Sequence, residues 1–198
     1  LEINVFNQNC LQIKGSLHQF WNGTNENDFT LQNTCTTIRE ICSLLSIHPN
    51  SVKLVNLECG VNVTTSIHPA DILKQIICYK NKLPTKPYDP QNHVEFYLNE
   101  RYIKLYNKGL RFDISNLFRF EVKYMRSRGL NSMHIFTFED LLKPESFLIL
   151  SKELPTYLTP IIFDDNTIKL NSLPKKDRNI YMLMKDGREW RKCTGNKR

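Results

Sequence analysis

Two segments in the middle of the chain alternate between apolar and polar residues, and this pattern constrains the fold more than any other feature. The segments are Arg101–Lys108 and Leu117–Tyr124. Successive side chains of a β-strand point to opposite faces, so a period of two indicates strands that bury one face and leave the other in water. Such half-buried strands are typical of antiparallel sheets. The sequence therefore predicts an antiparallel sheet with one polar face.

The rest of the chain supplies further strands and the helices to cover the sheet. Apolar spacing and turn residues predict strands at Glu2–Phe6 and Leu11–Phe20 around an Asn7–Asn9 turn, at Val52–Thr64 and at His93–Leu98, with a turn at Asn99 and Glu100. They predict helices at Thr30–Ile47, at Pro69–Tyr79 and from Thr137, where Pro144, Pro155 and Pro160 should divide the last region into short pieces. The expected fold class is α+β: a largely antiparallel central sheet with helices packed on one face.

Charge is distributed unevenly along the 198 residues, whose formal net charge is +7. Residues 168–198 contain ten Lys or Arg and three Asp or Glu, which accounts for the whole excess. We expect one main domain at 1–167, followed by a basic C-terminal tail or the start of a truncated second region at 168–198. Such a tail favours polyanions, although solvated terminal segments are equally common. The chain begins at Leu1, which is expected of a processed, trimmed or incomplete product.

Six cysteines lie far apart and form no C-x-x-C pair. Reduced thiols in apolar positions are the ordinary interpretation, so we expect a cytoplasmic protein. No apolar run reaches the length needed to cross a bilayer, and no membrane partner is expected.

The polar side of the two alternating segments carries aromatic and cationic residues. Tyr102, Lys104, Tyr106 and Lys108 share one face of the first segment. Tyrosine rings can stack on bases and ammonium groups can neutralise phosphates, so this face is suited to single-stranded nucleic acid. Alternatively, the tyrosines cover core residues and the lysines provide solubility.

Acidic and imidazole groups occupy matching polar positions on the predicted strands. Glu121 lies between Arg119 and Lys123, which should keep its carboxylate ionised. Further candidates are Glu58, His93 and Glu95. Oxygen-rich sets with one imidazole suit Mg²⁺ or Mn²⁺, although each residue alone is more often solvated or hydrogen bonded. The sequence contains no glycine-rich phosphate loop and no zinc-spaced Cys/His cluster, which argues against ATP hydrolysis and zinc chemistry.

Five short segments resemble the replication-initiation proteins of rolling-circle plasmids and filamentous phages, which are HUH-like nucleases. These segments are Gly15–Phe20, Asn25–Phe29, Leu57–Asn62, Ile103–Gly109 and Phe118–Lys123. The most specific element is the pair IKLYNKG and FRFEVK, about a dozen residues apart. The chain lacks the His-hydrophobic-His metal motif of many such initiators, and His93-Val-Glu95 would be a variant of it.

The resemblance implies a DNA-binding initiator that nicks and rejoins single-stranded DNA through a tyrosine-phosphate intermediate with Mg²⁺ or Mn²⁺. Its metal would be held by Glu58, Glu121, His93 and Glu95, and the DNA backbone by Lys104, Lys108, Arg119 and Lys123. Tyr106 is the preferred nucleophile, with Tyr102 and Tyr124 as further candidates and Tyr157 and Tyr181 kept open. Expected partners are single-stranded DNA or an origin hairpin and host replication proteins, with a homodimer as one possible state.

Two other functions remain open from the sequence. The chain could be a binding module of the same fold that holds DNA or RNA without cleaving it, or a protein-interaction domain with no nucleic-acid role. Nucleic-acid binding would weaken as the salt concentration rises, and protein interaction would show no such dependence on phosphate charge.

Overall fold

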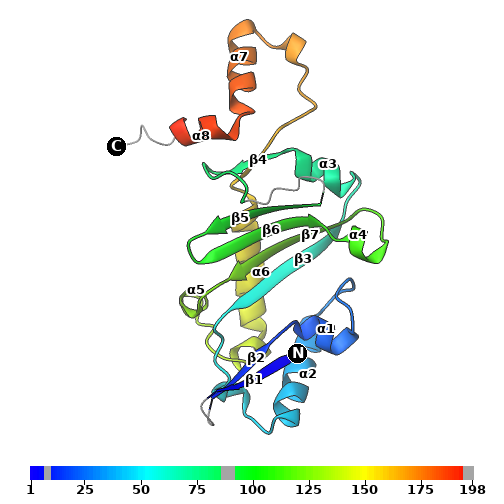
Figure 1. Cartoon of the computed structure of the whole chain (residues 1–198), viewed down its shortest axis with the longest axis vertical. Helices are drawn as coiled ribbons and strands as arrows, with labels where there is room; N and C mark the ends of the chain where they lie inside the picture. The colour runs from blue at the N-terminus through cyan, green and yellow to red at the C-terminus, as the bar shows by residue number, and fades with distance from the viewer. Residues whose placement is uncertain (7–9, 86–91, 194–198) are drawn as a thin grey trace. The chain divides into compact units, whose positions relative to one another are not determined.

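The computed structural model describes residues 1–6, 10–85 and 92–193, which form two compact units (Figure 1). Unit 1 comprises Leu1–Leu57 and Arg126–Ser151, and unit 2 comprises Glu58–Met125 and Lys152–Arg198. Strands and helices coexist, and the central sheet of four strands is mostly antiparallel. The predicted α+β class is confirmed.

Unit 1 combines a β-hairpin with short and medium helices. Its elements are β1 (Glu2–Phe6), β2 (Cys10–Lys14), α1 (Leu17–Asn22), α2 (Leu31–Leu44), η1 (Pro49–Ser51), α5 (Ser127–Asn131), η2 (Asp140–Leu142) and the first part of α6 (Pro144–Leu158). β1 and β2 pair antiparallel, with Ile3 opposite Ile13 and Val5 opposite Leu11. The predicted Asn7–Asn9 turn lies outside the described residues.

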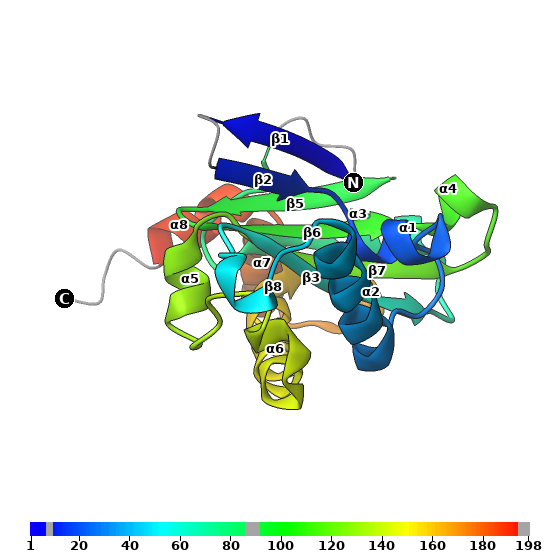
Figure 2. The same ribbon diagram turned by 90° about the horizontal axis from the view of Figure 1, so that it is seen from below.

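The α2 helix of unit 1 forms where the sequence predicts it. The Thr30 hydroxyl accepts a hydrogen bond from the Asn33 N–H at 3.2 Å and caps the helix. Ile38 and Ile41 are buried on one face of the helix, whereas Leu44 at its end is exposed. Helix α1 packs beside α2 (Figure 2). The three- and four-residue spacing of the apolar residues therefore correctly predicts the buried side of α2.

Unit 2 is built on a sheet with the strand order β3-β7-β6-β5. Its elements are β3 (Leu57–Thr64, whose first residue belongs to unit 1), α3 (Pro69–Lys74), β4 (Ile76–Tyr79), β5 (His93–Leu98), β6 (Arg101–Asn107), α4 (Gly109–Phe112), β7 (Leu117–Tyr124), the last part of α6, β8 (Ile161–Phe163), η3 (Leu170–Ser172), α7 (Lys175–Met184) and α8 (Gly187–Cys193). β6 pairs antiparallel with both β5 and β7, and the predicted turn joins β5 to β6.

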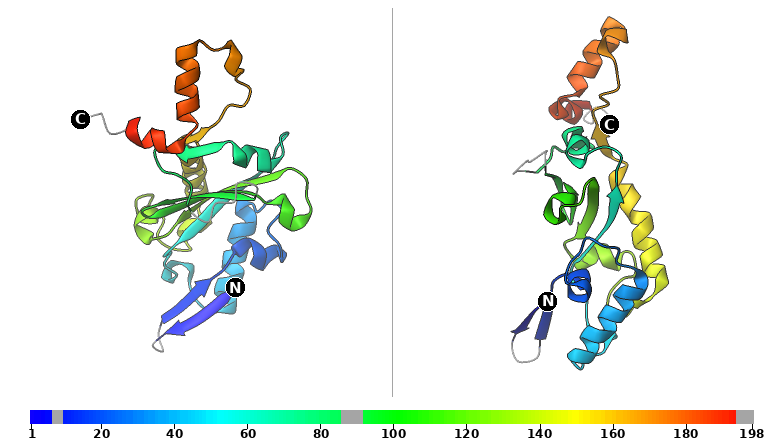
Figure 3. Two further views of the ribbon diagram at one scale, coloured as in Figure 1. Left: turned by 45° about the horizontal axis from the view of Figure 1, so that its top comes forward. Right: turned by 90° about the vertical axis from the view of Figure 1, so that its right-hand side faces the viewer.

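The apolar face of this sheet is the core of unit 2. Its innermost side chains are at most 3% exposed and come from the three strands that the alternation predicts: Val94, Phe96, Ile103, Leu105, Phe120, Val122 and Tyr124. The last turns of α6 lie along this face (Figure 3), where the rings of Tyr157 and Tyr124 meet edge to face at 6.4 Å. The opposite, polar face carries the candidate site.

Several predicted boundaries are wrong, and local chemistry explains each difference. The second strand ends at Lys14, because Gly15 takes a φ of +136° and Ser16 then caps α1. The strand predicted at Val52–Thr64 begins only at Leu57, since Leu54 instead donates its N–H to Phe136 in unit 1. The helix predicted at Pro69–Tyr79 ends at Lys74, and the chain continues as β4.

The region after Thr137 differs more from the prediction. The Asp140 carboxylate accepts hydrogen bonds from the N–H groups of Phe136 and Thr137, but the turn that follows is a short 3-10 helix. Helix α6 then runs without a break through Pro155, although proline lacks the N–H donor and its ring crowds the preceding turn of a helix. The predicted division into short pieces is wrong for this helix.

The region predicted as a basic tail contains α7 and α8 within its described part. The Tyr181 hydroxyl of α7 donates to the Asp164 carboxylate at 2.6 Å, and Lys185 Nζ lies 2.9 Å from the same carboxylate. These contacts attach α7 to the residues that follow β8. Across the described part of the chain, no helix combines the length and apolar character needed to span a bilayer.

Candidate nucleic-acid interface

The polar face of the four-stranded sheet brings most of the predicted site residues into three cross-strand rows. Reading from β5 through β6 to β7, the rows are His93, Tyr106 and Arg119; Glu95, Lys104 and Glu121; and Tyr97, Tyr102 and Lys123. Directly opposite residues on neighbouring strands have Cβ atoms about 5 Å apart, so side chains along each row can interact. The alternation in the sequence thus correctly predicts which residues share this face.

Glu121 has the largest set of polar contacts on the polar face, although only 4% of its surface is exposed. Its Oε1 accepts hydrogen bonds from the Tyr106 hydroxyl at 2.9 Å and from Arg119 Nε. Lys104 Nζ lies 3.9 Å from Oε2 of the same carboxylate. Burial alone would raise the pKa of Glu121, but the Arg119 guanidinium and the Tyr106 hydroxyl hold that pKa below its ordinary value. Glu121 is therefore ionised at neutral pH, as its neighbours in the sequence indicate.

The two tyrosines of β6 both donate their hydroxyl protons to carboxylates. Tyr102 donates to Glu95 Oε2, while Tyr106 donates to Glu121. Burial is the largest cause of a raised pKa in both tyrosines, and the nearby carboxylates add to it. Together they raise the pKa of Tyr102 to about 12 and also raise the pKa of Tyr106. Both phenols consequently stay protonated at neutral pH, and their rings are held in fixed positions.

Tyr97 is a residue of this face that the sequence reasoning missed. It is 52% exposed, and its ring meets the Tyr102 ring edge to face at 5.9 Å. Tyr97 shares a period of two with His93 and Glu95 along β5, and this pattern is the sequence signal that places it on the same face. The polar face therefore carries three tyrosines, of which Tyr97 is the most accessible.

Gly60 and Asn62 of β3 were also missed. A Cβ atom on Gly60 would lie 2.5 Å from the Phe120 carbonyl oxygen and 2.6 Å from Glu121 Cγ, so only glycine allows β3 to approach β7 this closely. Asn62 Oδ1 accepts hydrogen bonds from Arg119 at 2.7 Å and from Lys108 Nζ at 3.4 Å. A glycine within a strand pattern was the signal for the close approach.

Two predicted site residues do not lie on the accessible polar face. Lys108 follows β6 and is only 2% exposed, so its ammonium is not on the open surface. Tyr124 is 1% exposed and lies on the apolar face of the sheet. Its ring is near the Tyr157 ring and the Arg101 guanidinium. The roles predicted for them stay predictions, and Tyr124 is separated from the polar face by the sheet itself.

The predicted metal ligands do not fit a divalent ion in this arrangement. The Lys104 ammonium lies 3.1 Å from Glu58 Oε2 and 3.9 Å from Glu121 Oε2, where a metal shared by these carboxylates would have to lie. Glu95 holds Tyr102, and His93 lies in the neighbouring row. In the described ranges, no three His, Cys, Asp or Glu side chains form a group that could hold a metal ion. Mg²⁺ or Mn²⁺ binding stays a prediction.

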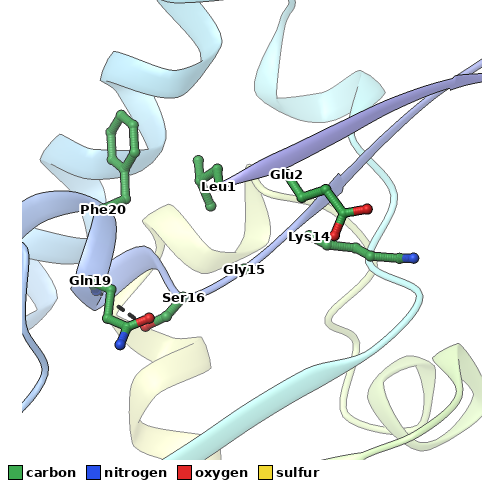
Figure 4. A pocket seen from close by; sticks show the side chains of 7 residues that line it. All are labelled: Leu1, Glu2, Lys14, Gly15, Ser16, Gln19 and Phe20. Atoms are coloured by element: carbon green, nitrogen blue, oxygen red, sulfur yellow. Dashed lines mark hydrogen bonds between the residues drawn. The ribbon is translucent and has the colours of Figure 1, made fainter.

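Two hollows elsewhere in the units are weaker candidates for a site. One of about 360 Å³ in unit 1 lies beside Gly15, and Figure 4 shows the Glu2 and Lys14 side chains extending away from Phe20. These two charged side chains therefore do not converge on a ligand position with Phe20 (Figure 4). Another of about 420 Å³ in unit 2 includes Lys185 and Asp164, which pair with each other.

Comparison of the chain with family models, with curated proteins and with solved structures found no match.

Proposed function

We propose that the polar face of the four-stranded sheet in unit 2 binds single-stranded nucleic acid. The observation that supports this best is the group of Tyr97, Tyr102 and Tyr106 on one face, interleaved with cationic side chains. Two of these rings are held by hydrogen bonds to carboxylates, which lowers the entropy lost when a base stacks on them. A paired duplex hides its base faces, so a single strand is the better ligand.

The charges of the face indicate that stacking contributes more than phosphate neutralisation. Glu58, Glu95 and Glu121 balance Lys104, Arg119 and Lys123. Lys104 and Arg119 are engaged by carboxylates, whereas the structure records no ion pair for Lys123 among the described residues. Lys123 is therefore the cation best placed to meet a phosphate. Each phosphate contact on a single strand contributes a slope of about −0.7 to the logarithmic salt dependence of binding.

Fluorescence anisotropy with a labelled single strand of about 16 nucleotides, at several salt concentrations, tests this proposal. Tyr97→Ala should weaken binding by about 1–3 kcal/mol, because one stacked base loses its ring. Phe163→Ala is the matched control, since Phe163 is also a partly exposed aromatic residue of unit 2 but lies on β8. Lys123→Ala should reduce the salt slope by about 0.7, and Lys152→Ala on α6 should not.

Equal effects of Tyr97→Ala and Phe163→Ala would refute the assignment of the polar face. Absence of any binding by the wild-type chain to either DNA or RNA single strands would refute the function itself and favour a protein-interaction domain.

The strand-transfer activity of a replication initiator is a second candidate, and one contact favours it. The Tyr106 hydroxyl lies 2.9 Å from Glu121 Oε1, which is the geometry of a nucleophile beside a general base. Tyr106 Oη would attack a DNA phosphorus as the bond to the 3′ oxygen breaks. Glu121 would accept the phenolic proton and pass it to that 3′ oxygen. The low pKa of Glu121 makes it a weak base, which is why we place binding first.

A covalent adduct would identify this reaction. The chain is incubated with labelled single strands or hairpins, with and without Mn²⁺, and analysed by denaturing electrophoresis. The activity predicts a denaturation-resistant adduct that Tyr106→Phe abolishes and Tyr97→Phe retains. An adduct that survives Tyr106→Phe would exclude this nucleophile, and the absence of any adduct with binding intact would leave the binding function alone.

A further inference from the structure

We infer that Lys104 is the resident cation of the polar face: its ammonium takes the place of a divalent metal between the Glu58 and Glu121 carboxylates. The two carboxylates come from β3 and β7, and Lys104 comes from β6, the next strand of the sheet. The consequence for nucleic-acid binding rests on the proposed function, whereas the assignment of the cation does not.

The position of Lys104 in the sheet carries the argument. On one side it lies directly opposite Glu95 of β5, and on the other directly opposite Glu121 of β7. Its Nζ donates a hydrogen bond to Glu58 of β3 at 3.1 Å and lies 3.9 Å from Glu121. An ammonium with three donors can serve several carboxylates at once. The Lys104 ammonium therefore joins acidic side chains of two other strands, β3 and β7.

The remaining neighbours fix Lys104 in this position. The Lys104 side chain is 25% exposed, and its Nζ lies 5.8 Å from the centre of the Tyr102 ring. Tyr102 is in turn held by Glu95. The cation thus lies beside an aromatic ring while the Glu58 and Glu121 carboxylates approach its charged end, an arrangement that stabilises an ammonium ion.

Charge balance explains why a divalent ion would not enter beside Lys104. Glu121 already pairs with Arg119, and Glu58 already pairs with Lys104. Mg²⁺ and Mn²⁺ need oxygen ligands at little more than 2 Å, so a metal among these carboxylates would come close to the ammonium and repel it. Removing the ammonium, in contrast, would leave the Glu58 and Glu121 carboxylates around one position with no cation between them. Lys104 consequently positions these carboxylates and makes a metal unnecessary for holding them together.

Mn²⁺ titration of the full chain, followed by electron paramagnetic resonance, tests the inference without nucleic acid. Lys104→Met keeps most of the side-chain volume but removes the charge, and it should bind one Mn²⁺ at least about tenfold more tightly than wild type, an affinity change of ~1.4 kcal/mol. Adding Glu121→Gln to Lys104→Met should abolish the gain. Lys123→Met, which removes a charge from the neighbouring row, is the matched control and should show no gain.

Thermal unfolding gives a second readout if Lys104→Met folds poorly. Mn²⁺ should raise the unfolding midpoint of this variant and leave that of the wild type unchanged, because a ligand that binds only the native state stabilises it. Lys104→Ala should behave in the same way. A folded Lys104→Met or Lys104→Ala with no gain in Mn²⁺ affinity would overturn the inference. So would a wild-type Mn²⁺ site that Glu58→Gln or Glu121→Gln removes.

Oligonucleotide binding in EDTA separates this inference from the proposed function. If Lys104 is the resident cation, wild-type affinity for a single strand should be the same in EDTA and in Mn²⁺. An EDTA-sensitive affinity would overturn the inference while leaving the binding function in place. Complete absence of binding would refute the proposed function, and the Mn²⁺ titration would still decide the role of Lys104.

Discussion

The two faces of the sheet in unit 2 both combine tyrosine with arginine, but with opposite consequences. On the polar face, Arg119 and Tyr106 meet at the carboxylate of Glu121. On the apolar face, the Arg101 guanidinium lies 5.4 Å from the centre of the Tyr124 ring and 5.6 Å from that of Tyr157. The same residue types thus form an ionic network on one side and a cation–π cluster on the other.

The two faces differ in whether the guanidinium forms an ion pair with a carboxylate. Where Glu121 is available, guanidinium and hydroxyl groups point their N–H and O–H bonds at it, and the rings remain near the surface. On the apolar face the structure records no ion pair for Arg101 among the described residues, although burial and, to a smaller extent, the nearby Glu153 carboxylate raise the pKa of Tyr124. The Arg101 guanidinium lies over the ring faces instead, and the tyrosines become part of the core. Tyrosines on the polar face can therefore serve a ligand, whereas those on the apolar face serve stability.

The strongest test of this distinction compares alanine substitutions of one tyrosine from each face. Tyr124→Ala should lower the free energy of unfolding by about 3–5 kcal/mol, because it leaves a cavity under α6. Tyr106→Ala should cost less, since Tyr106 is only partly buried. Urea denaturation measures both. A larger loss for Tyr106→Ala would show that the polar face also belongs to the core.

Glu121→Gln should produce a smaller loss, about 1–3 kcal/mol near neutral pH, because Arg119 loses its charged partner. Its pH dependence is more informative. The pKa of Glu121 is held below its ordinary value in the folded chain, so its contribution to stability is complete above about pH 4.5 and decreases as the pH falls through the folded pKa. The difference in unfolding free energy between wild type and variant should therefore shrink on acidification from pH 6 to pH 3. A constant difference would contradict the ionic role.

Much of the central sheet could be predicted, because each strand shows its own period of two. His93–Leu98 and Leu117–Tyr124 begin and end as expected, and Arg101–Lys108 is only one residue too long. Periodicity also correctly predicts that Tyr102, Lys104 and Tyr106 of β6 share the polar face. These features depend on local side-chain direction, which the sequence contains.

Pairings between distant segments could not be predicted in this way. The three-residue strand β8 is too short to show a period, and it forms only because β4 is available as a partner. The polar face shows the same limit. The sequence places Glu58, Glu121 and Lys104 on one surface, but it does not reveal that the lysine comes between the carboxylates. Strand order and register decide that contact.

Arg101→Met gives the smallest expected effect and the narrowest test of the comparison. The methionine side chain can keep most of the packing between Tyr124 and Tyr157, so the change removes chiefly the cation–π contacts, worth about 0.5–2 kcal/mol of unfolding free energy. Arg101→Lys, which retains a cation, should recover part of this loss. Neither variant should change the affinity for a single strand, because Arg101 contacts the rings of the opposite face. A fall in affinity at unchanged stability would mean that the two faces are coupled through β6, and that Arg101 affects the polar face as well as the core.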